Sequence, residues 1–516
     1  MTSKTIFHIT LAGIISISLY LCATIQLQYY VNGNITWLLI AAERFLEGQN
    51  IVEHIYESNP PLSIFIYIPH VLFSKLSGVS LPDSSIIVTF ILPILSTLHV
   101  HHIIKQFPNL KTHEAIAFTT AYFMSITIAT TSSFSEREHF IIMTIAPFIL
   151  CQYAMIEKIH INKVLLWFTY LIGALFILVK PHYGILPTIF LIHRAIKFRT
   201  LKIVFDPDFL SLSIMTILYL SVLFIFFFDY LSIVFPDAVS LYAKTVYNVE
   251  HTKAVTQTYM LVFISVFLFE LFREDPDNKN KSLIMLLHLS CIICMIPYYT
   301  QMKGFYNHLV PALSFFLMGT MLTIYYSVKK KIKKYEISMS IALIATLLMI
   351  SYFYSVKTDS LKQKDIANLS PTVFLEENCP KPCTFFAFHS DIELFNPIAA
   401  TMGYTHASRF PAMWFLPELL KKPEENTELK QKYTRFLIKD LKHYQPNIIL
   451  VLKDLTIHFI PFDFYEYFGE DPELEKILST QYEKQEDFNF HESEYYTRQE
   501  NGWTYKYDVY FRKPNP

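Results

Sequence analysis

Long apolar runs, broken by short polar segments, dominate the first two thirds of the chain. Many of these runs approach the roughly 20 residues that a helix needs to cross a bilayer. The pattern therefore predicts a polytopic α-helical membrane part. The predicted spans are 7–28, 84–104, 114–133, 139–157, 163–179, 183–196, 209–230, 257–272, 282–299, 305–328 and 337–355.

One further apolar segment, 61–76, is short and contains Pro69-His70 in its middle. If it crossed the membrane, every later loop would change side. Lys and Arg concentrate in inner loops, and their distribution favours an arrangement in which 61–76 lies in the outer interface. The basic run 329–334 is then inside. The result is eleven spans, with the N-terminus inside and the C-terminus outside.

After residue 356 the pattern becomes that of a soluble domain. Residues 428–444 have apolar positions at helical spacing, and 448–452 form a short apolar run that predicts a buried strand. Segments 384–388 and 504–511 are further strand candidates. We therefore expect a transmembrane domain over 1–356, with a long first outer loop at 29–83, and an α/β domain over 357–516 on the outer, periplasmic side.

Composition agrees with this division. Of the 516 residues, 52% are hydrophobic and 17% charged, and the formal net charge is −1. Near-neutrality gives no reason to expect a nucleic-acid partner. Six cysteines are too few for a disulfide scaffold. Cys379 and Cys383 alone lie in a polar stretch, either as a small-loop disulfide or as a free pair.

The predicted topology places the unusual polar clusters on the outer side, close to the membrane. Uncompensated charges are costly there, so each cluster needs a reason. Single residues could be explained by snorkelling of their charged ends, but a shared outer-leaflet cavity explains the set. The clusters are Asn34 to Asn59, 135–139, 180–183, 232–256 and 301–308.

Basic side chains in such a cavity suit a phosphate, which Arg contacts through two donors and Lys as a point charge. A carboxylate such as Glu57 or Glu138 could take the proton of an acceptor hydroxyl. A lipid-linked phosphate fits a site at this depth, because its tail can remain in the bilayer.

Over about residues 7–330 the sequence resembles the GT-C superfamily of membrane glycosyltransferases. This superfamily includes protein O-mannosyltransferases, the aminoarabinose transferase of lipid A and enzymes grouped with rhizobial lipopolysaccharide sugar transferases. The resemblance rests on the order and sidedness of five segments. They are 34–48, Glu-Ser-Asn-Pro-Pro-Leu at 57–62, Arg-Glu-His at 137–139, Lys-Pro-His-Tyr at 180–183 and Gln-Met-Lys-Gly-Phe-Tyr-Asn-His at 301–308.

The resemblance implies an inverting hexosyl or pentosyl transferase that uses a polyprenyl-phosphate-linked sugar. It also implies an acidic residue early in the first outer loop, where this chain has Asn34. An amide cannot take up a proton as a carboxylate does. Either Glu53, Glu57 or Glu138 is then the base, or the chain binds the lipid-linked sugar without transferring it.

The resemblance also implies roles for individual residues. Catalysis is assigned to Glu57, Glu138, His139 and the Asn34 position. Donor-phosphate binding is assigned to Arg137, Lys180, Lys303 and His308. Acceptor or substrate binding is assigned to Asn59, His182, Tyr183, Gln301 and Tyr306. No cofactor is expected, although Glu57, Glu138, His139 and His308 could converge on a divalent metal ion, without the spacing of a metal motif.

The leading hypothesis is thus a sugar transferase of the bacterial inner membrane, with a glycan such as lipopolysaccharide, a lipid or a protein as acceptor. A transporter or flippase of a lipid-linked glycan is the alternative, and a recruiting scaffold is a third. In the outer domain, Arg409 and Trp414 either cap the cavity or hold the domain to the membrane part, Trp414 as a buried residue and Arg409 as a surface residue.

Overall fold

The computed structural model describes residues 16, 20, 22–24, 26, 31–130, 133–245, 249–273, 280–331, 366–421, 424–453, 455–457, 460–485, 487–491 and 504–514. The predicted spans 7–28 (apart from residues 16, 20, 22–24 and 26) and 337–355 lie outside the described residues, as does the predicted domain boundary at 356–357. The chain forms two compact units. One comprises Met1–Leu27, Ile86–Ile225 and Val246–Val356, and the other Gln28–Ser85, Phe226–Thr245 and Lys357–Pro516.

The first unit is helical. Within the described residues its main helices are α5 (Leu81–Ile104), α6 (Thr112–Ile128), α7 (Arg137–Ile156), α8 (Lys163–Ile177), α9 (Ile185–Phe198), α10 (Pro207–Phe226), α12 (Val249–Phe272), α13 (Lys281–Gln301) and α14 (Val310–Lys331). Six of the described helices are long and apolar enough to cross a membrane: α5, α7, α10, α12, α13 and the helix over Tyr306–Val328. Helices α6, α8 and α9 occupy three further predicted spans but are shorter.

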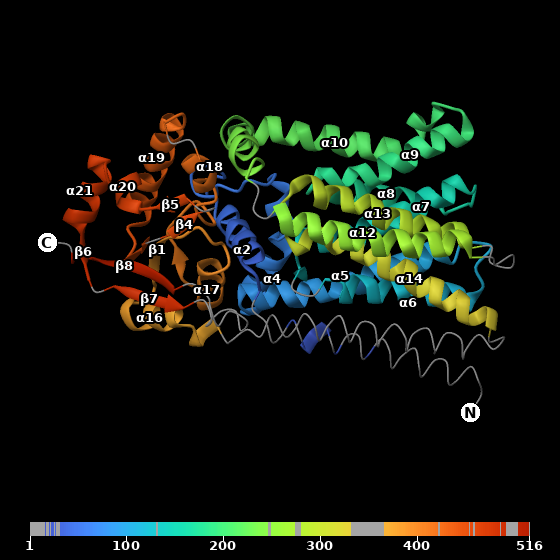
Figure 1. Ribbon diagram of the computed structural model, residues 1–516, viewed down its shortest axis with the longest axis horizontal. Helices are drawn as coiled ribbons and strands as arrows, with labels where there is room; N and C mark the ends of the chain where they lie inside the picture. Colours follow the sequence, from blue (N-terminus) through green and yellow to red (C-terminus); the bar gives the residue numbers. More distant parts are fainter. Residues whose placement is uncertain are drawn as a thin grey trace. The chain divides into compact units, whose positions relative to one another are not determined.

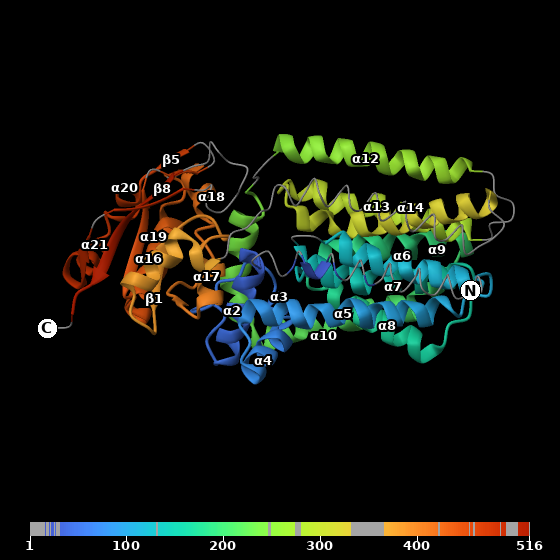
Figure 2. The ribbon, with the colours of Figure 1, turned by 90° about the horizontal axis from the view of Figure 1, so that it is seen from below.

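Helix α14 packs against α6, α7 and α13 (Figure 1). Helix α12 in turn lies beside α13, and Figure 2 shows α12, α13 and α14 running alongside one another. The side chains of α7 are almost all buried, whereas few of those on α10 and α12 are buried. An apolar helix surface without a protein neighbour is what a lipid-facing helix presents.

Several helix boundaries differ from the sequence prediction, and two of them lie beside the first turn of α7. The predicted 114–133 span ends at Ile128, and the predicted 139–157 span already begins at Arg137. Arg137, Glu138 and His139 therefore form the first turn of α7 instead of the end of a loop. A carboxylate in a first turn is favoured by the positive end of the helix dipole.

The second unit contains a mixed sheet with strand order β2-β1-β3-β8-β6, and β7 also pairs with β8. Strands β1 (Thr384–Phe388), β2 (Thr405–His406) and β3 (Ile448–Lys453) are parallel, and β8 (Thr504–Arg512) runs antiparallel to β3 with Leu450 opposite Val509. Strands β6 (Tyr482–Lys484) and β7 (Phe488–His491) pair with successive parts of β8, and β4 (Leu455–Ile457) and β5 (Ile460–Phe462) form a separate ribbon. The buried strands β1 and β3 lie at the predicted segments 384–388 and 448–452, and β8 lies at the predicted segment 504–511 (β1 and β8 are labelled in Figure 1).

Helices surround this sheet and also come from the predicted first outer loop. They are α2 (Gly33–Leu46), α3 (Leu62–Phe65), α4 (Ile68–Ser77), α16 (Ser370–Asn378), α17 (Phe395–Met402), α18 (Leu416–Lys421), α19 (Thr427–Tyr444), α20 (Phe464–Phe468) and α21 (Pro472–Gln481). Residues 230–242 form a π-helical turn, the short helix α11 (Phe235–Asp237) and a second π-helical turn. Gln28–Ser85 and Phe226–Thr245 thus form one unit with Lys357–Pro516.

Helix α2 packs directly on α17, and a glycine makes this possible. A Cβ on Gly33 would lie 2.1 Å from the carbonyl oxygen of Ile392. The Gly33 N–H donates to Oε2 of Glu393 at 2.7 Å, so a carboxylate caps the start of α2. The close approach explains why the first position of α2 has no side chain.

Candidate functional site

The candidate site of the first unit forms where α7 begins, α8 ends and α13 is joined to α14. Glu138 is fully buried in the first turn of α7, and Lys180, which follows α8, is 6% exposed. The Lys180 ammonium forms an ion pair with Oε1 of Glu138. Two charges at such a depth persist only when each compensates the other.

Two neighbours from the α13–α14 connection contact the same carboxylate oxygen. Nδ2 of Asn307 donates to Oε1 of Glu138 at 3.2 Å, and Nε2 of His308 lies 3.5 Å from that oxygen. Oε2 of Glu138 is buried and has no hydrogen-bond partner among the described residues. The carboxylate is therefore asymmetric, with one oxygen held by three groups and the other available.

Short turns hold these side chains in place. Pro181 begins a 3₁₀ turn over Pro181–Gly184, which places the Tyr183 hydroxyl 3.0 Å from the His308 carbonyl oxygen to which it donates. A second 3₁₀ turn, Tyr306–Leu309, carries Asn307 and His308 into α14. The hydrogen bond between the two turns fixes the backbone that positions Asn307 and His308.

Burial dominates the electrostatics of the Lys180 region. Burial lowers the pKa of Lys180 below its ordinary value, Glu138 opposes this shift, and the charge of Arg137 adds to it. Burial and then the positive charge of Lys180 lower the pKa of His182 to about 4. His182 is thus neutral near pH 7, and its Nε2 lies 3.2 Å from Nε2 of Gln301, within hydrogen-bonding distance.

The remaining predicted residues of this unit make other contacts; His139 is fully buried and Tyr306 is half-buried. Nδ1 of His139 accepts from the Ser135 N–H at 3.3 Å, and the Tyr306 hydroxyl donates to the Ala129 carbonyl oxygen at 2.8 Å. Lys303 is buried in the connection after α13. The structure thus brings Glu138, Lys180 and His308 into contact, pairs His182 with Gln301, and joins Tyr183 to the backbone of His308.

Three predicted residues belong to the second unit. Asn34 lies half-buried in the first turn of α2, one residue after the Gly33 that Glu393 caps. Oε2 of Glu57 accepts from the Trp37 indole N–H at 2.7 Å, and Oε1 accepts from the Asn59 N–H at 2.8 Å and from the Asn59 side-chain amide. Both oxygens of Glu57 are therefore engaged in shaping the loop, unlike those of Glu138.

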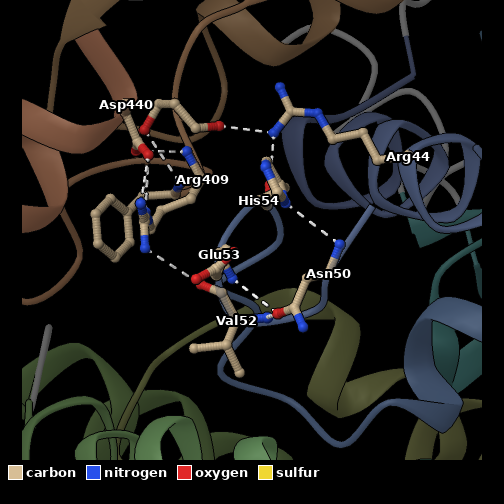
Figure 3. Close-up of polar contacts among 9 residues, drawn as sticks. Arg44, Asn50, Val52, Glu53, His54, Arg409 and Asp440 are labelled. Carbon is tan, nitrogen blue, oxygen red and sulfur yellow. Dashed lines mark hydrogen bonds and ion pairs between the residues drawn. The ribbon is translucent and has the colours of Figure 1, made fainter. Parts of the chain in front are cut away.

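The loop with Arg409 and Trp414 corrects one expectation. Arg409 is not a surface residue: it is 3% exposed and binds Asp440 of α19, with its Nε 2.8 Å from Oδ1 (Figure 3). Its backbone N–H also donates to Oδ2 of Asp440, and its side chain donates to the Val52 carbonyl oxygen at 3.4 Å. Trp414 is buried, as expected.

A second arginine reinforces this junction. The Arg44 guanidinium donates to the carbonyl oxygens of His54 at 2.9 Å and of Ser408 at 2.7 Å (Figure 3). Asn50 turns the chain before His54 by accepting the N–H groups of Val52 and Glu53. This network connects the early loop to the C-terminal segment within the second unit.

Sequence reasoning missed Asn307 as a site residue. Asn307 lies in the 301–308 segment, between the predicted residues Tyr306 and His308, and only the structure shows its contact with Glu138. Among the described residues, no group of three or more His, Cys, Asp or Glu side chains is placed to hold a metal ion. The metal alternative stays a prediction.

No family model and no curated protein matches the sequence. The structure is similar to the crystal structure of ArnT from Cupriavidus metallidurans in the apo state. The TM-score is 0.50 at 10% identity, over 96% of this chain and 97% of that chain. A crystal structure of ArnT from the same organism, bound to undecaprenyl phosphate, gives a TM-score of 0.47 at 11% identity, with the same shares covered.

At this level of identity the likeness to the apo structure concerns the fold. The chain has the fold of that ArnT structure: a polytopic helical membrane protein with a C-terminal α/β domain, as the sequence predicted.

Proposed function

We propose that the chain transfers a sugar from a polyprenyl-phosphate-linked donor to a glycan, lipid or protein acceptor at the outer face of a bacterial inner membrane. The observation that carries the proposal is the buried Glu138 carboxylate, with Lys180 on one oxygen and the other oxygen available. The GT-C fold supports it, because the fold is that of ArnT. The N-terminus inside and the C-terminal domain in the periplasm complete the proposed arrangement.

The proposed reaction is a single displacement that inverts the anomeric centre. The acceptor hydroxyl oxygen bonds to the anomeric carbon, and the bond between that carbon and the phosphate oxygen breaks. The electron pair leaves with the polyprenyl phosphate, and the hydroxyl proton goes to Glu138. Lys180, with Arg137, Lys303 and His308, would stabilise the negative charge of the departing phosphate.

Glu138 is a better candidate for the base than Glu57. One oxygen of Glu57 already accepts a hydrogen bond from Trp37 and the other from Asn59, which holds the group in the loop. Oε2 of Glu138 has no such donor among the described residues. We assign His139 to orienting the first turn of α7, and His182, Tyr183, Gln301 and Tyr306 to the substrate side of the site.

The test is a deletion strain complemented with single variants, followed by mass profiles of its envelope glycans and lipid A. We expect Glu138→Gln and Lys180→Ala to lose one sugar mass from a product, and Glu57→Gln to keep most of it. Asp208→Asn is the matched control. It removes a buried carboxylate of the same unit but leaves Arg194 paired with Asp206 at 3.0 Å.

Full wild-type profiles from Glu138→Gln and Lys180→Ala would refute the transferase proposal. A deletion that changes no glycan, in a protein that still binds the lipid phosphate, would instead favour a transporter or a non-catalytic binder. That alternative arises because Asn34 stands where the family resemblance implies an acidic residue.

A further inference from the structure

The three contacts on Oε1 of Glu138 raise a question of charge balance. The Lys180 ammonium and the Glu138 carboxylate neutralise each other in a buried place. A phosphate that reached Lys180 would bring a second negative charge next to Glu138. Like charges at close range in a buried site repel strongly. Lys180 therefore cannot form a full-strength ion pair with the phosphate and with the Glu138 carboxylate at the same time.

The contacts of Asn307 and His308 with Oε1 of Glu138 do not depend on the Lys180 ammonium. The amide of Asn307 donates to Oε1 whether or not Lys180 does. His308 stands beside the same oxygen, and its backbone is held by the Tyr183 hydroxyl. Glu138 would therefore keep its place after losing Lys180, with Oε2 still unoccupied.

We propose that the Lys180–Glu138 ion pair keeps Glu138 inactive in the absence of donor, and that the donor phosphate breaks this pair. Glu138 then becomes an effective base only when the donor is bound. Asn307 is the positioning residue that retains the released carboxylate. This inference rests on the proposed function, and it adds an order: donor first, acceptor second. A carboxylate relieved of its counter-charge binds a proton more strongly, which is what removal of a hydroxyl proton requires.

The order has a chemical benefit. Without the donor, the carboxylate is neutralised by Lys180 and does not activate water or an acceptor. When the donor phosphate binds Lys180, the base is released beside the anomeric carbon that is to be attacked. The proton then moves from the acceptor hydroxyl to Oε2, as the sugar moves from phosphate to acceptor.

The first test measures binding of undecaprenyl phosphate to the detergent-solubilised full-length protein, with undecaprenol as the uncharged control. Lys180→Met should weaken phosphate binding about tenfold, whereas Glu138→Gln should tighten it by about the same factor. Asp208→Asn should leave it unchanged. If the wild type does not prefer the phosphate to the alcohol, the proposed function itself fails. If it does, but Glu138→Gln binds undecaprenyl phosphate no more tightly than the wild type, competition between the phosphate and Glu138 for Lys180 is refuted and the proposed function stands.

A second test uses the wild-type protein and so does not depend on a variant that folds. Dicyclohexylcarbodiimide modifies carboxyl groups in apolar surroundings when they take up a proton, and mass spectrometry locates the modified residue. Undecaprenyl phosphate should increase modification of Glu138 severalfold, and undecaprenol should not. Lys180→Met should give the increased modification without any lipid.

Charge repulsion alone would tighten binding in Glu138→Gln but would leave the carboxylate paired. Unchanged modification of Glu138 in the lipid-bound wild type therefore overturns the inference. Asn307→Ala tests the positioning role: it should lower kcat of sugar transfer with little change in phosphate affinity. An equal loss of both would show that Asn307 has a general structural role instead.

Discussion

The buried Arg409–Asp440 pair lies within the C-terminal segment, and Arg409 also donates to the Val52 carbonyl oxygen of the early loop, so loss of the pair should be severe. Replacing Arg409 with Met keeps most of the apolar bulk but leaves Asp440, which is 1% exposed, as a buried carboxylate without its counter-charge. Breaking one side of a buried ion pair typically costs about 3–5 kcal/mol. For a unit of this size, each kcal/mol lowers the unfolding temperature by about 2–4 °C. We therefore expect a decrease of about 6–20 °C.

The assay is thermal unfolding of the full-length protein in detergent, followed by the fluorescence of its Trp residues. Lys442→Met on the same helix is the matched control, because the Lys442–Glu473 pair is half-exposed and such pairs contribute about 0–1 kcal/mol. The double variant Arg409→Met with Asp440→Asn should recover much of the loss, because no unpaired buried charge remains.

The pH dependence gives the sign of the effect. Burial raises the pKa of Asp440 above its ordinary value, and Arg409 opposes this shift. A carboxyl group with a raised folded-state pKa destabilises the fold progressively as the pH rises through that range. The loss in Arg409→Met should therefore be smaller near pH ~5 than near pH ~8. A loss that is independent of pH, or a double variant as unstable as the single one, would refute the reasoning.

Three further predictions concern close contacts and the cysteines. Gly33→Ala should lower the unfolding temperature by several degrees, because its Cβ would meet the Ile392 backbone at 2.1 Å. Gly184→Ala is the control and should lower it only slightly, because its Cβ would lie 3.3 Å from an Ile177 methyl group. Equal decreases in the two variants would contradict the argument. Gly319→Ala should destabilise the first unit, because its Cβ would lie 2.8 Å from Cε1 of His288, and His288→Ala in the same chain should relieve the clash; no relief would show another cause. Cys379 and Cys383, which form a disulfide, should react with iodoacetamide only after reduction when the protein is isolated from membranes under alkylating conditions; labelling before reduction would place them in a reducing compartment.

Local elements were predictable because local patterns determine them. The apolar run at 384–388 is a strand with those same bounds, and the amphipathic segment at 428–444 is helix α19, extended by one residue. The set of chain segments that make up the second unit was not predictable in this way. Its contacts join residues hundreds of positions apart, such as Gly33 with Glu393, and no periodicity reports them.

The candidate site shows the same division. Charged side chains next to apolar runs identified Glu138, Lys180 and His308, because charge at membrane depth needs compensation. Their shared contact on one oxygen required the structure, as did the role of Asn307. The prediction of Arg409 as a surface residue was wrong because the sequence does not reveal that Arg409 pairs with Asp440, 31 positions later, and this pairing allows its burial.

The central claim is that Lys180 receives the donor phosphate and releases Glu138. A cryo-electron microscopy structure of the full-length protein with undecaprenyl phosphate tests it most directly. We predict phosphate density within hydrogen-bonding distance of Lys180 Nζ, with Glu138 separated from that nitrogen but still within reach of Asn307. Phosphate density elsewhere, with the Lys180–Glu138 pair intact, would contradict the account.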